Sequence, residues 1–134
     1  THQCPANLSV TIESDRIDNE NVHQFYHDNR VDWFMLMSET EGGVPVSICE
    51  AMSHGVPVIA ASSGAIPEIV DSSTGLLLSH DPDDNEFLTA INRFIGGRET
   101  AGTLRVNARE RWRNSFNSQQ LRDSFVSEIS QLLP

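Results

Sequence analysis

The stretch SETEGGVPVSICEAMSHGVPVIA, residues 38–60, is the part of the chain around which the rest is organised. An apolar run at residues 31–37 precedes it, and a second apolar run at residues 57–60 ends it. Between them lie a Gly42-Gly43 turn and a short helical segment, so the order strand, glycine turn, helix, strand is predicted. That order places backbone N–H groups and a helix N-terminus at the end of a strand, where open α/β sheets bind ligands.

Strand and helix patterns continue to alternate on both sides of this stretch. Strands are expected at residues 8–12, 31–37, 57–61 and 75–79. Helices are expected at residues 19–28, 45–54, 67–70, 82–95, 99–115 and 119–132, with Asp18, Asp81 and Ser118 as N-caps. The alternation predicts an α/β fold in which helices flank a parallel sheet of about four strands, with the strand at residues 31–37 covered on both faces.

Composition limits the size of the fold and the class of partner. The 134 residues, 38% of them hydrophobic, suffice for about one globular domain. The net charge is −10, which argues against nucleic acid as a partner. All nine cationic side chains are arginines, and none lies between Arg30 and Arg93. An anionic ligand at the central stretch therefore has to be held by backbone N–H groups and a helix dipole, or by residues outside this chain.

The sequence has no pattern of a membrane span, a signal peptide or a metal site. No apolar run approaches the ~20 residues that cross a bilayer, and the N-terminus lacks a basic segment followed by an apolar one. Cys4 and Cys49 form no disulfide or metal pattern, which favours a reducing compartment, and the histidines are scattered without ligand spacing. We therefore expect a cytoplasmic protein that uses neither a metal ion nor a cofactor.

Glu41 and Glu50 are the residues of the central stretch best suited to chemistry. A carboxylate accepts hydrogen bonds from two vicinal hydroxyls of a sugar or a ribose, and both residues lie near the Gly42-Gly43 turn. A structural interpretation competes: Ser47-x-x-Glu50 is a capping box, which makes Glu50 a helix-start residue without a ligand. The two glycines also have two interpretations, ligand approach to the backbone or a turn with positive φ. The residues alone leave these alternatives open.

The central stretch and its continuation SSGAIPEIVDSSTGLLL, residues 62–78, resemble a known family. They are similar to the C-terminal domain of retaining nucleotide-sugar glycosyltransferases of family 4, also called group 1, which have the two-domain GT-B fold with Rossmann-like domains. The resemblance covers most of the chain. It rests on matches in the family's order at Glu41-Gly42, Pro45, Glu50-Ala51-Met52, Gly55, Pro57-Val58-Ile59-Ala60, Gly64, Glu68 and Thr74-Gly75.

The resemblance implies a function and a role for each residue of the motif. The enzyme would be a hexosyltransferase that transfers a sugar from an NDP-sugar donor to an acceptor hydroxyl, in a setting such as polysaccharide biosynthesis. Glu41 would be the catalytic residue that contacts the hydroxyls of the donor sugar, and Glu50 would hold the ribose. The backbone of Gly42, Gly43 and Val44 would approach the sugar and the diphosphate, whose charge is stabilised without a metal ion.

This sequence departs from the family pattern in three ways. Eight residues lie between Glu41 and Glu50, one more than is usual. Ala65 stands where a second glycine is common. The acceptor domain and the first strands of the donor domain, with the cations that neutralise the diphosphate, are absent from residues 1–134. We therefore expect a single, partial C-terminal donor-binding domain that lacks transferase activity on its own.

A partial domain has consequences for the partners. The carbohydrate or lipid-linked acceptor would bind through the missing N-terminal region, and the parent enzyme would be cytoplasmic or peripheral to the membrane. The strand at residues 8–12 cannot take its usual place in an isolated monomer, so it is expected to reposition, to pair with another chain or to join a second copy. Two other functions stay open: a GT-B epimerase acting on the nucleotide sugar without an acceptor, and a non-catalytic α/β interaction domain.

Overall fold

The structure is a computed structural model that describes residues 9, 11, 17–95 and 98–132. In this part of the chain, three strands form one parallel sheet in the order β1-β2-β3, namely β1 (Phe34–Leu36), β2 (Val58–Ala61) and β3 (Gly75–Leu78). The helices are α1 (Asn19–Asp28), α2 (Val46–Ser53), α3 (Ile66–Ile69), α4 (Asp84–Ile95), α5 (Arg98–Arg111) and α6 (Ser118–Leu132), with a π-helical turn, η1 (Trp112–Phe116), before α6. The predicted α/β fold with a parallel sheet is confirmed.

Strand β2 is the centre of this sheet. All four of its residues are buried, and Val58 pairs with Phe34 on one side and with Gly75 on the other. A parallel strand that is covered on both faces and paired along both edges has no solvent-facing side, so its sequence is a continuous apolar run rather than an alternating one. The run at residues 57–61 has this character.

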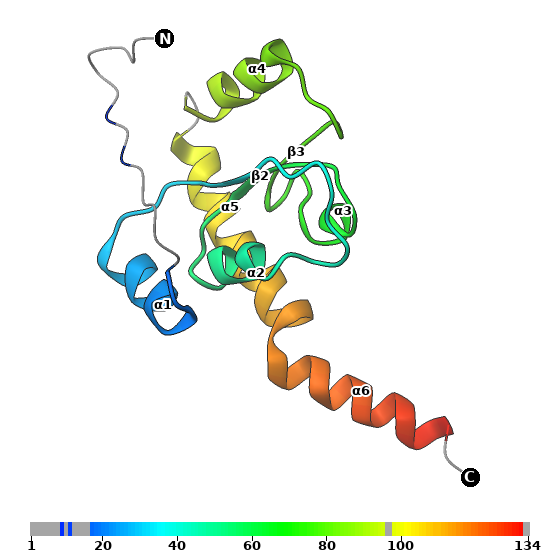
Figure 1. The fold of residues 1–134 in the computed structure, drawn as a ribbon. Helices are drawn as coiled ribbons and strands as arrows, with labels where there is room; N and C mark the ends of the chain where they lie inside the picture. The colour runs from blue at the N-terminus through cyan, green and yellow to red at the C-terminus, as the bar shows by residue number, and fades with distance from the viewer. Residues whose placement is uncertain (1–8, 10, 12–16, 96–97, 133–134) are drawn as a thin grey trace.

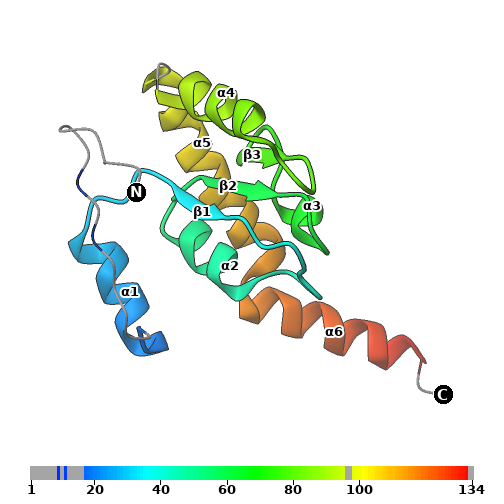
Figure 2. The ribbon, with the colours of Figure 1, turned by 45° about the horizontal axis from the view of Figure 1, so that its top comes forward.

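Side chains alternate along the strands and form one apolar cluster on each face of the sheet. On one face, Val58 and Ala60 belong to a cluster completed by α2, α3 and α5, with the members Ile48, Met52, Val58, Ala60, Ile66, Ile69, Val70 and Ala108. On the other face, Ile59 and Leu78 pack against Ala90 of α4. Helices α2 and α4 accordingly lie on opposite sides of the sheet (Figure 1, Figure 2). The core therefore fixes α2, the helix that follows the glycine turn.

Strand β1 differs from the strand predicted at residues 31–37. It is shorter, it lies at an edge of the described sheet, and Met35 and Met37 are 42% and 40% exposed. The prediction that this strand is covered on both faces is wrong, because the cluster on the α4 side is built from β2 and β3 and reaches only Trp33 before β1. The strand predicted at residues 8–12 lies outside the described residues, apart from residues 9 and 11.

The predicted helices are present, but two of them start at other caps. Helix α4 begins after Asp83, whose carboxylate accepts a first-turn N–H at 2.7 Å, and not after Asp81. Helix α6 begins after Asn117, whose side-chain carbonyl accepts a first-turn N–H at 3.0 Å, so Ser118 is its first residue. Asp18 precedes α1 as predicted, although its side chain makes no cap hydrogen bond. The observed N-caps of α4 and α6 thus lie one or two residues from the predicted ones, and both are residues of a type that is common at N-caps.

Helix α6 extends away from the rest of the molecule in both views (Figure 1, Figure 2). Its apolar side chains are largely in contact with solvent, among them Leu121, Phe125, Val126, Ile129 and Leu132. No helix in the described part of the chain combines the length and the apolar character needed to cross a bilayer.

A glycine in β3 is predicted to be essential for the sheet. A Cβ on Gly75 would lie 2.0 Å from the carbonyl oxygen of Val58, which is backbone and cannot turn aside. We expect Gly75→Ala to lower the free energy of unfolding by at least about 2 kcal/mol, measured by urea denaturation. The matched control is Gly102→Ala in α5, where nothing lies within 4 Å of an added Cβ. That change should raise stability by about 0.5–1 kcal/mol, and equal effects of the two changes would contradict the packing argument.

Candidate functional site

The loop between β1 and α2 is tied to the loop that follows β2. The backbone N–H of Glu41 donates to Oγ of Ser63 at 3.0 Å, and the Ser63 hydroxyl donates to the carbonyl oxygen of Glu39 at 3.1 Å. Ser63 is only 3% exposed, so both hydrogen bonds are partly shielded from water. A single side chain thereby fixes the backbone on both sides of residue 40 at the carboxyl edge of the sheet.

Gly64 brings the same two loops into direct backbone contact. Its φ is +51°, and a Cβ at this position would lie 1.9 Å from the carbonyl oxygen of Glu41. Any other residue would have to adopt left-handed backbone and displace the Glu41 loop. Gly64 therefore serves both a turn and a close approach between two chain segments.

Gly42 and Gly43 have the opposite character. Both are exposed, neither has a positive φ, and nothing lies within 4 Å of a Cβ built on either residue. A turn that requires positive φ is therefore not the reason for these glycines. Val44, in contrast, packs its side chain against the main apolar cluster. The result is an open stretch of backbone with fixed ends.

The capping-box interpretation of Glu50 is wrong. Helix α2 starts at Val46, its N-cap is Pro45 in extended conformation, and no side chain caps it. Ser47 is consequently inside the first turn, and Glu50 is the fifth residue of the helix, too far along to reach the N-cap N–H. Among the described residues, the carboxylate of Glu50 has no hydrogen-bond or ion-pair partner. The half-buried position of Glu50 thus lacks a capping explanation.

Glu50 acts electrostatically on two neighbouring side chains. Burial raises the pKa of Tyr26 on α1, and the charge of Glu50 raises it further. The same two causes, in the same order, raise the pKa of the Cys49 thiol. Cys49 packs against the main apolar cluster as a protonated, partly buried side chain, which agrees with a structural role. Glu50 therefore borders α1, a neighbourhood that the sequence pattern did not indicate.

The candidate residues follow one another in one short part of the chain. Glu41, Gly42, Gly43 and Val44 form the β1–α2 loop, and Glu50 follows in α2. The backbone of Glu41 is anchored toward the β2–α3 loop, whereas the side chain of Glu50 lies near α1. Sequence reasoning missed Ser63, because a serine in a Ser-Ser-Gly turn gives no sign of which loop it will bind.

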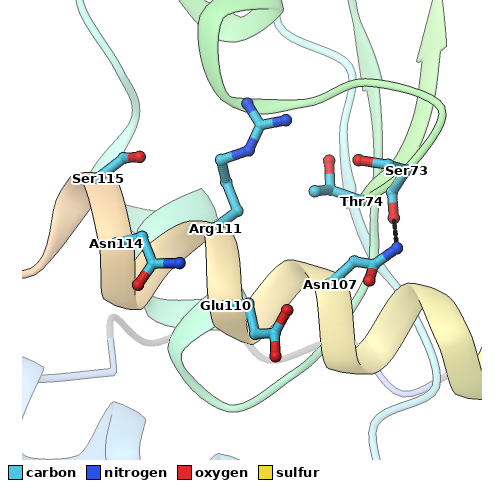
Figure 3. Close-up of a pocket in the computed structure, with 7 residues that line it drawn as sticks. All are labelled: Ser73, Thr74, Asn107, Glu110, Arg111, Asn114 and Ser115. Carbon is cyan, nitrogen blue, oxygen red and sulfur yellow. Dashed lines mark hydrogen bonds between the residues drawn. The ribbon is translucent and has the colours of Figure 1, made fainter.

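Two cavities are lined by residues other than Glu41–Val44 and Glu50. One of about 240 Å³ opens at the carboxyl edge of the sheet, lined by Met37, Glu39, Ala61, His80, Asp81, Pro82, Asp84 and Phe87. A polar groove of about 440 Å³ lies at the opposite edge, between α5 and the turn before β3 (Figure 3). Its lining residues are Ser73, Thr74, Asn107, Glu110, Arg111, Asn114 and Ser115.

Polar contacts in the groove hold α5 against the sheet. Asn107 donates to the carbonyl oxygen of Ser73 at 2.9 Å (Figure 3), and Arg111 forms an ion pair with Asp71. Burial opposes ionisation of Asp71, but hydrogen bonds from Ser73 and the Arg111 guanidinium outweigh it and lower the pKa of the carboxyl group. Within residues 9, 11, 17–95 and 98–132, no three His, Cys, Asp or Glu side chains gather as metal ligands would.

Comparison of the sequence with known proteins finds relatives among sugar-transferring enzymes. The chain is 32% identical over 110 residues to the sulfoquinovosyl transferase SQD2 of Arabidopsis thaliana, covering 79% of this chain and 20% of that protein. It is 29% identical over 102 residues to the putative colanic acid biosynthesis glycosyltransferase WcaL of Salmonella typhimurium, covering 72% of this chain and 25% of the relative. The chain thus spans about a fifth to a quarter of the length of these relatives.

Solved structures share the fold. Sucrose-phosphate synthase from Thermosynechococcus elongatus superimposes with a TM-score of 0.69 and 28% identity over 87% of this chain and 29% of that chain. HepE of Anabaena, solved in complex with UDP, superimposes with a TM-score of 0.62 and 25% identity over 72% of this chain and 27% of that one. The sequence profile of the family described as glycosyl transferases group 1 matches residues 6–96, so the chain belongs to the group 1 glycosyl transferases.

Proposed function

We propose that this chain forms the nucleotide-sugar side of a retaining glycosyltransferase, which transfers a hexosyl group from an NDP-sugar to an acceptor hydroxyl. The observation that carries the proposal is the open backbone at Gly42 and Gly43, held between Glu41 and α2 at the carboxyl edge of a parallel sheet. The structure of HepE with UDP, a relative of similar fold, supports a nucleotide ligand.

The N-terminus of α2 is suited to the diphosphate. Pro45 is the N-cap, the first intrahelical hydrogen bonds are donated by Ile48 and Cys49, and the first turn contains no acidic residue. The N–H groups of Val46 and Ser47 are therefore without helical partners and can bind an anion, and the helix dipole adds to the attraction. We propose that these groups, and not a metal ion, stabilise the leaving diphosphate.

Each glutamate has a proposed role. The carboxylate of Glu50, which lacks a hydrogen-bond partner among the described residues, accepts the ribose hydroxyls. Glu41, whose backbone is fixed by Ser63 and Gly64, acts as the catalytic residue at the donor sugar. We further propose that residues 1–134 are part of one donor-binding domain, and that the acceptor and additional cations are bound by the rest of a longer enzyme.

Nucleotide binding tests the proposal most directly. UDP, GDP and ADP are titrated against the longest form of the protein that contains residues 1–134, and one of them is expected to bind. Gly43→Ala should weaken binding about tenfold or more, because its Cβ occupies space that is open to a ligand but touches nothing in the fold. Gly102→Ala serves as the control and should leave the affinity unchanged. Equal affinity of the wild type and Gly43→Ala would contradict the site.

The ribose role of Glu50 predicts a specific coupling. Glu50→Gln should weaken binding of the preferred nucleotide about tenfold, since hydrogen bonds to a charged acceptor contribute about 1.5–3 kcal/mol. The 2′,3′-dideoxy analogue of this nucleotide should bind the wild type more weakly than the nucleotide does, by a similar factor. The analogue should bind Glu50→Gln no more weakly than it binds the wild type, because the hydroxyls that Glu50 would contact are absent. A dideoxy penalty of the same size in both proteins would remove Glu50 from the ribose site.

Transfer activity tests the role of Glu41. In the longest active form, Glu41→Gln should lower kcat/KM for the NDP-sugar about a hundredfold while changing the affinity for the free nucleoside diphosphate less than about twofold. Residues 1–134 alone should turn over no donor. A glycosylated product made by this chain alone would contradict the proposed partial domain, and conversion of the donor to an epimer without an acceptor would contradict the transferase assignment.

A further inference from the structure

Helix α1 contacts α2 through an unusual pair of histidines. Nδ1 of His23 lies 2.9 Å from Nε2 of His54, and their rings are tilted at 42° with centroids 5.2 Å apart. The ring of Tyr26 also stacks on His54, with ring centroids 5.2 Å apart and an angle of 17° between the rings. At this distance the two nitrogens share one proton, because one of them has to donate and the other has to accept.

The charges around His54 disfavour a second proton. From α1 it is faced by His23 and His27, and from α5 by Arg109. Arg105 of α5 also reaches this end of α2, where it donates to the carbonyl oxygen of Gly55 at 3.4 Å. Burial first, and then the charges of His23, Arg109 and His27, lower the pKa of His54 from its ordinary value of 6.5.

Besides these histidines and arginines, an acidic side chain, Glu50, and a phenol, Tyr26, lie where α1 meets α2. Tyr26 is half-buried and stacks on His54, and burial first and then the charge of Glu50 raise the pKa of its phenol. Tyr26 of α1 therefore contacts the histidine pair and also lies near Glu50, the glutamate of the candidate site.

We propose that α1, docked on α2 through Tyr26 and the His23–His54 pair, positions the neighbouring Glu50, and that protonation of the pair in mildly acid solution releases α1 and with it this positioning. The inference rests on the ribose role proposed for Glu50. In the docked pair only one of the two facing nitrogens can carry a proton, so the two rings cannot both be fully protonated while α1 stays docked. Release therefore takes up protons, and docking weakens as the pH falls below 6.5, the ordinary pKa of histidine.

The first arm of the test measures docking without a nucleotide. Amide hydrogen exchange of α1 is compared with that of α5 in the 134-residue chain between about pH 7.5 and pH 5.5. The ratio of α1 to α5 protection should fall at least about fivefold below pH 6.5. His54→Gln, and as a second variant His23→Gln, should abolish this fall, because an amide can hydrogen-bond but does not titrate. His80→Gln is the matched control, since His80 bonds a backbone carbonyl far from α1, and it should behave like the wild type.

Three results of this arm would overturn the inference. A constant ratio in the wild type would show that α1 docking does not depend on pH. The same pH dependence in both glutamine variants would place the titrating group elsewhere. Loss of the dependence in His80→Gln would do so as well.

The second arm connects docking with the candidate site. In the longest form of the protein, the Kd of the preferred nucleoside diphosphate should rise between pH 7.5 and pH 5.5 about threefold to tenfold more in the wild type than in His54→Gln, where only the titration of the ligand's own phosphate remains. Tyr26→Ala should weaken binding at pH 7.5, and Tyr26→Phe, which keeps the stacked ring, should restore it. Unchanged affinity in Tyr26→Ala would remove the positioning role. Absence of nucleotide binding at every pH would instead refute the proposed function, and the exchange measurement would still decide whether α1 is released.

Discussion

The candidate site depends on a backbone contact between two loops that follow neighbouring strands. The carbonyl oxygen of Glu41 lies where a side chain on Gly64 would begin, and the hydroxyl of Ser63 bonds the chain on both sides of residue 40. Because β1 and β2 are parallel and paired, their carboxyl ends lie together, and this contact extends the rigidity of the sheet into the loop. Without this contact, the loop that contains the two glycines after Glu41 would be flexible. With the contact, the backbone of these glycines is open to solvent but held in place.

The glycines of this chain serve two different physical purposes, and only the structure separates them. Gly64 and Gly75 are required because another backbone segment occupies the space of their missing side chains. Gly42 and Gly43 face open space, so a side chain at either position would meet no other atom of the protein within 4 Å of its Cβ. This open space is what the proposed approach of a ligand to the backbone requires.

Much of the fold follows from the sequence, because apolar periodicity and punctuation by glycine and proline act locally. The bounds of α1 and the central strand β2 could be predicted in this way. The capping-box interpretation of Ser47 and Glu50 failed because Pro45 is the N-cap of α2. The spacing of residues in the sequence does not reveal which turn of the helix is the first. The prediction that β1 is covered on both faces failed because α4 packs only against the other two strands. Where a helix packs is a property of the tertiary structure. The roles of Ser63 and Tyr26 depend on contacts with residues that are 22 or more positions away in the sequence, and no local pattern encodes such contacts.

The distribution of charge explains why such a site would be incomplete on its own. Arg105 donates to the carbonyl oxygen of Val31 and pairs with Asp32, both before β1, and Arg111 pairs with Asp71 before β3. These arginines therefore fasten α5 to the amino edge of the sheet, while the carboxyl edge carries Glu39 and Glu41. A diphosphate at that edge meets N–H groups and a helix dipole but also two carboxylates, and a dipole worth about 0.3–1 kcal/mol does not balance full negative charges. The proposed diphosphate site therefore needs positive charge that Arg105 and Arg111 do not supply.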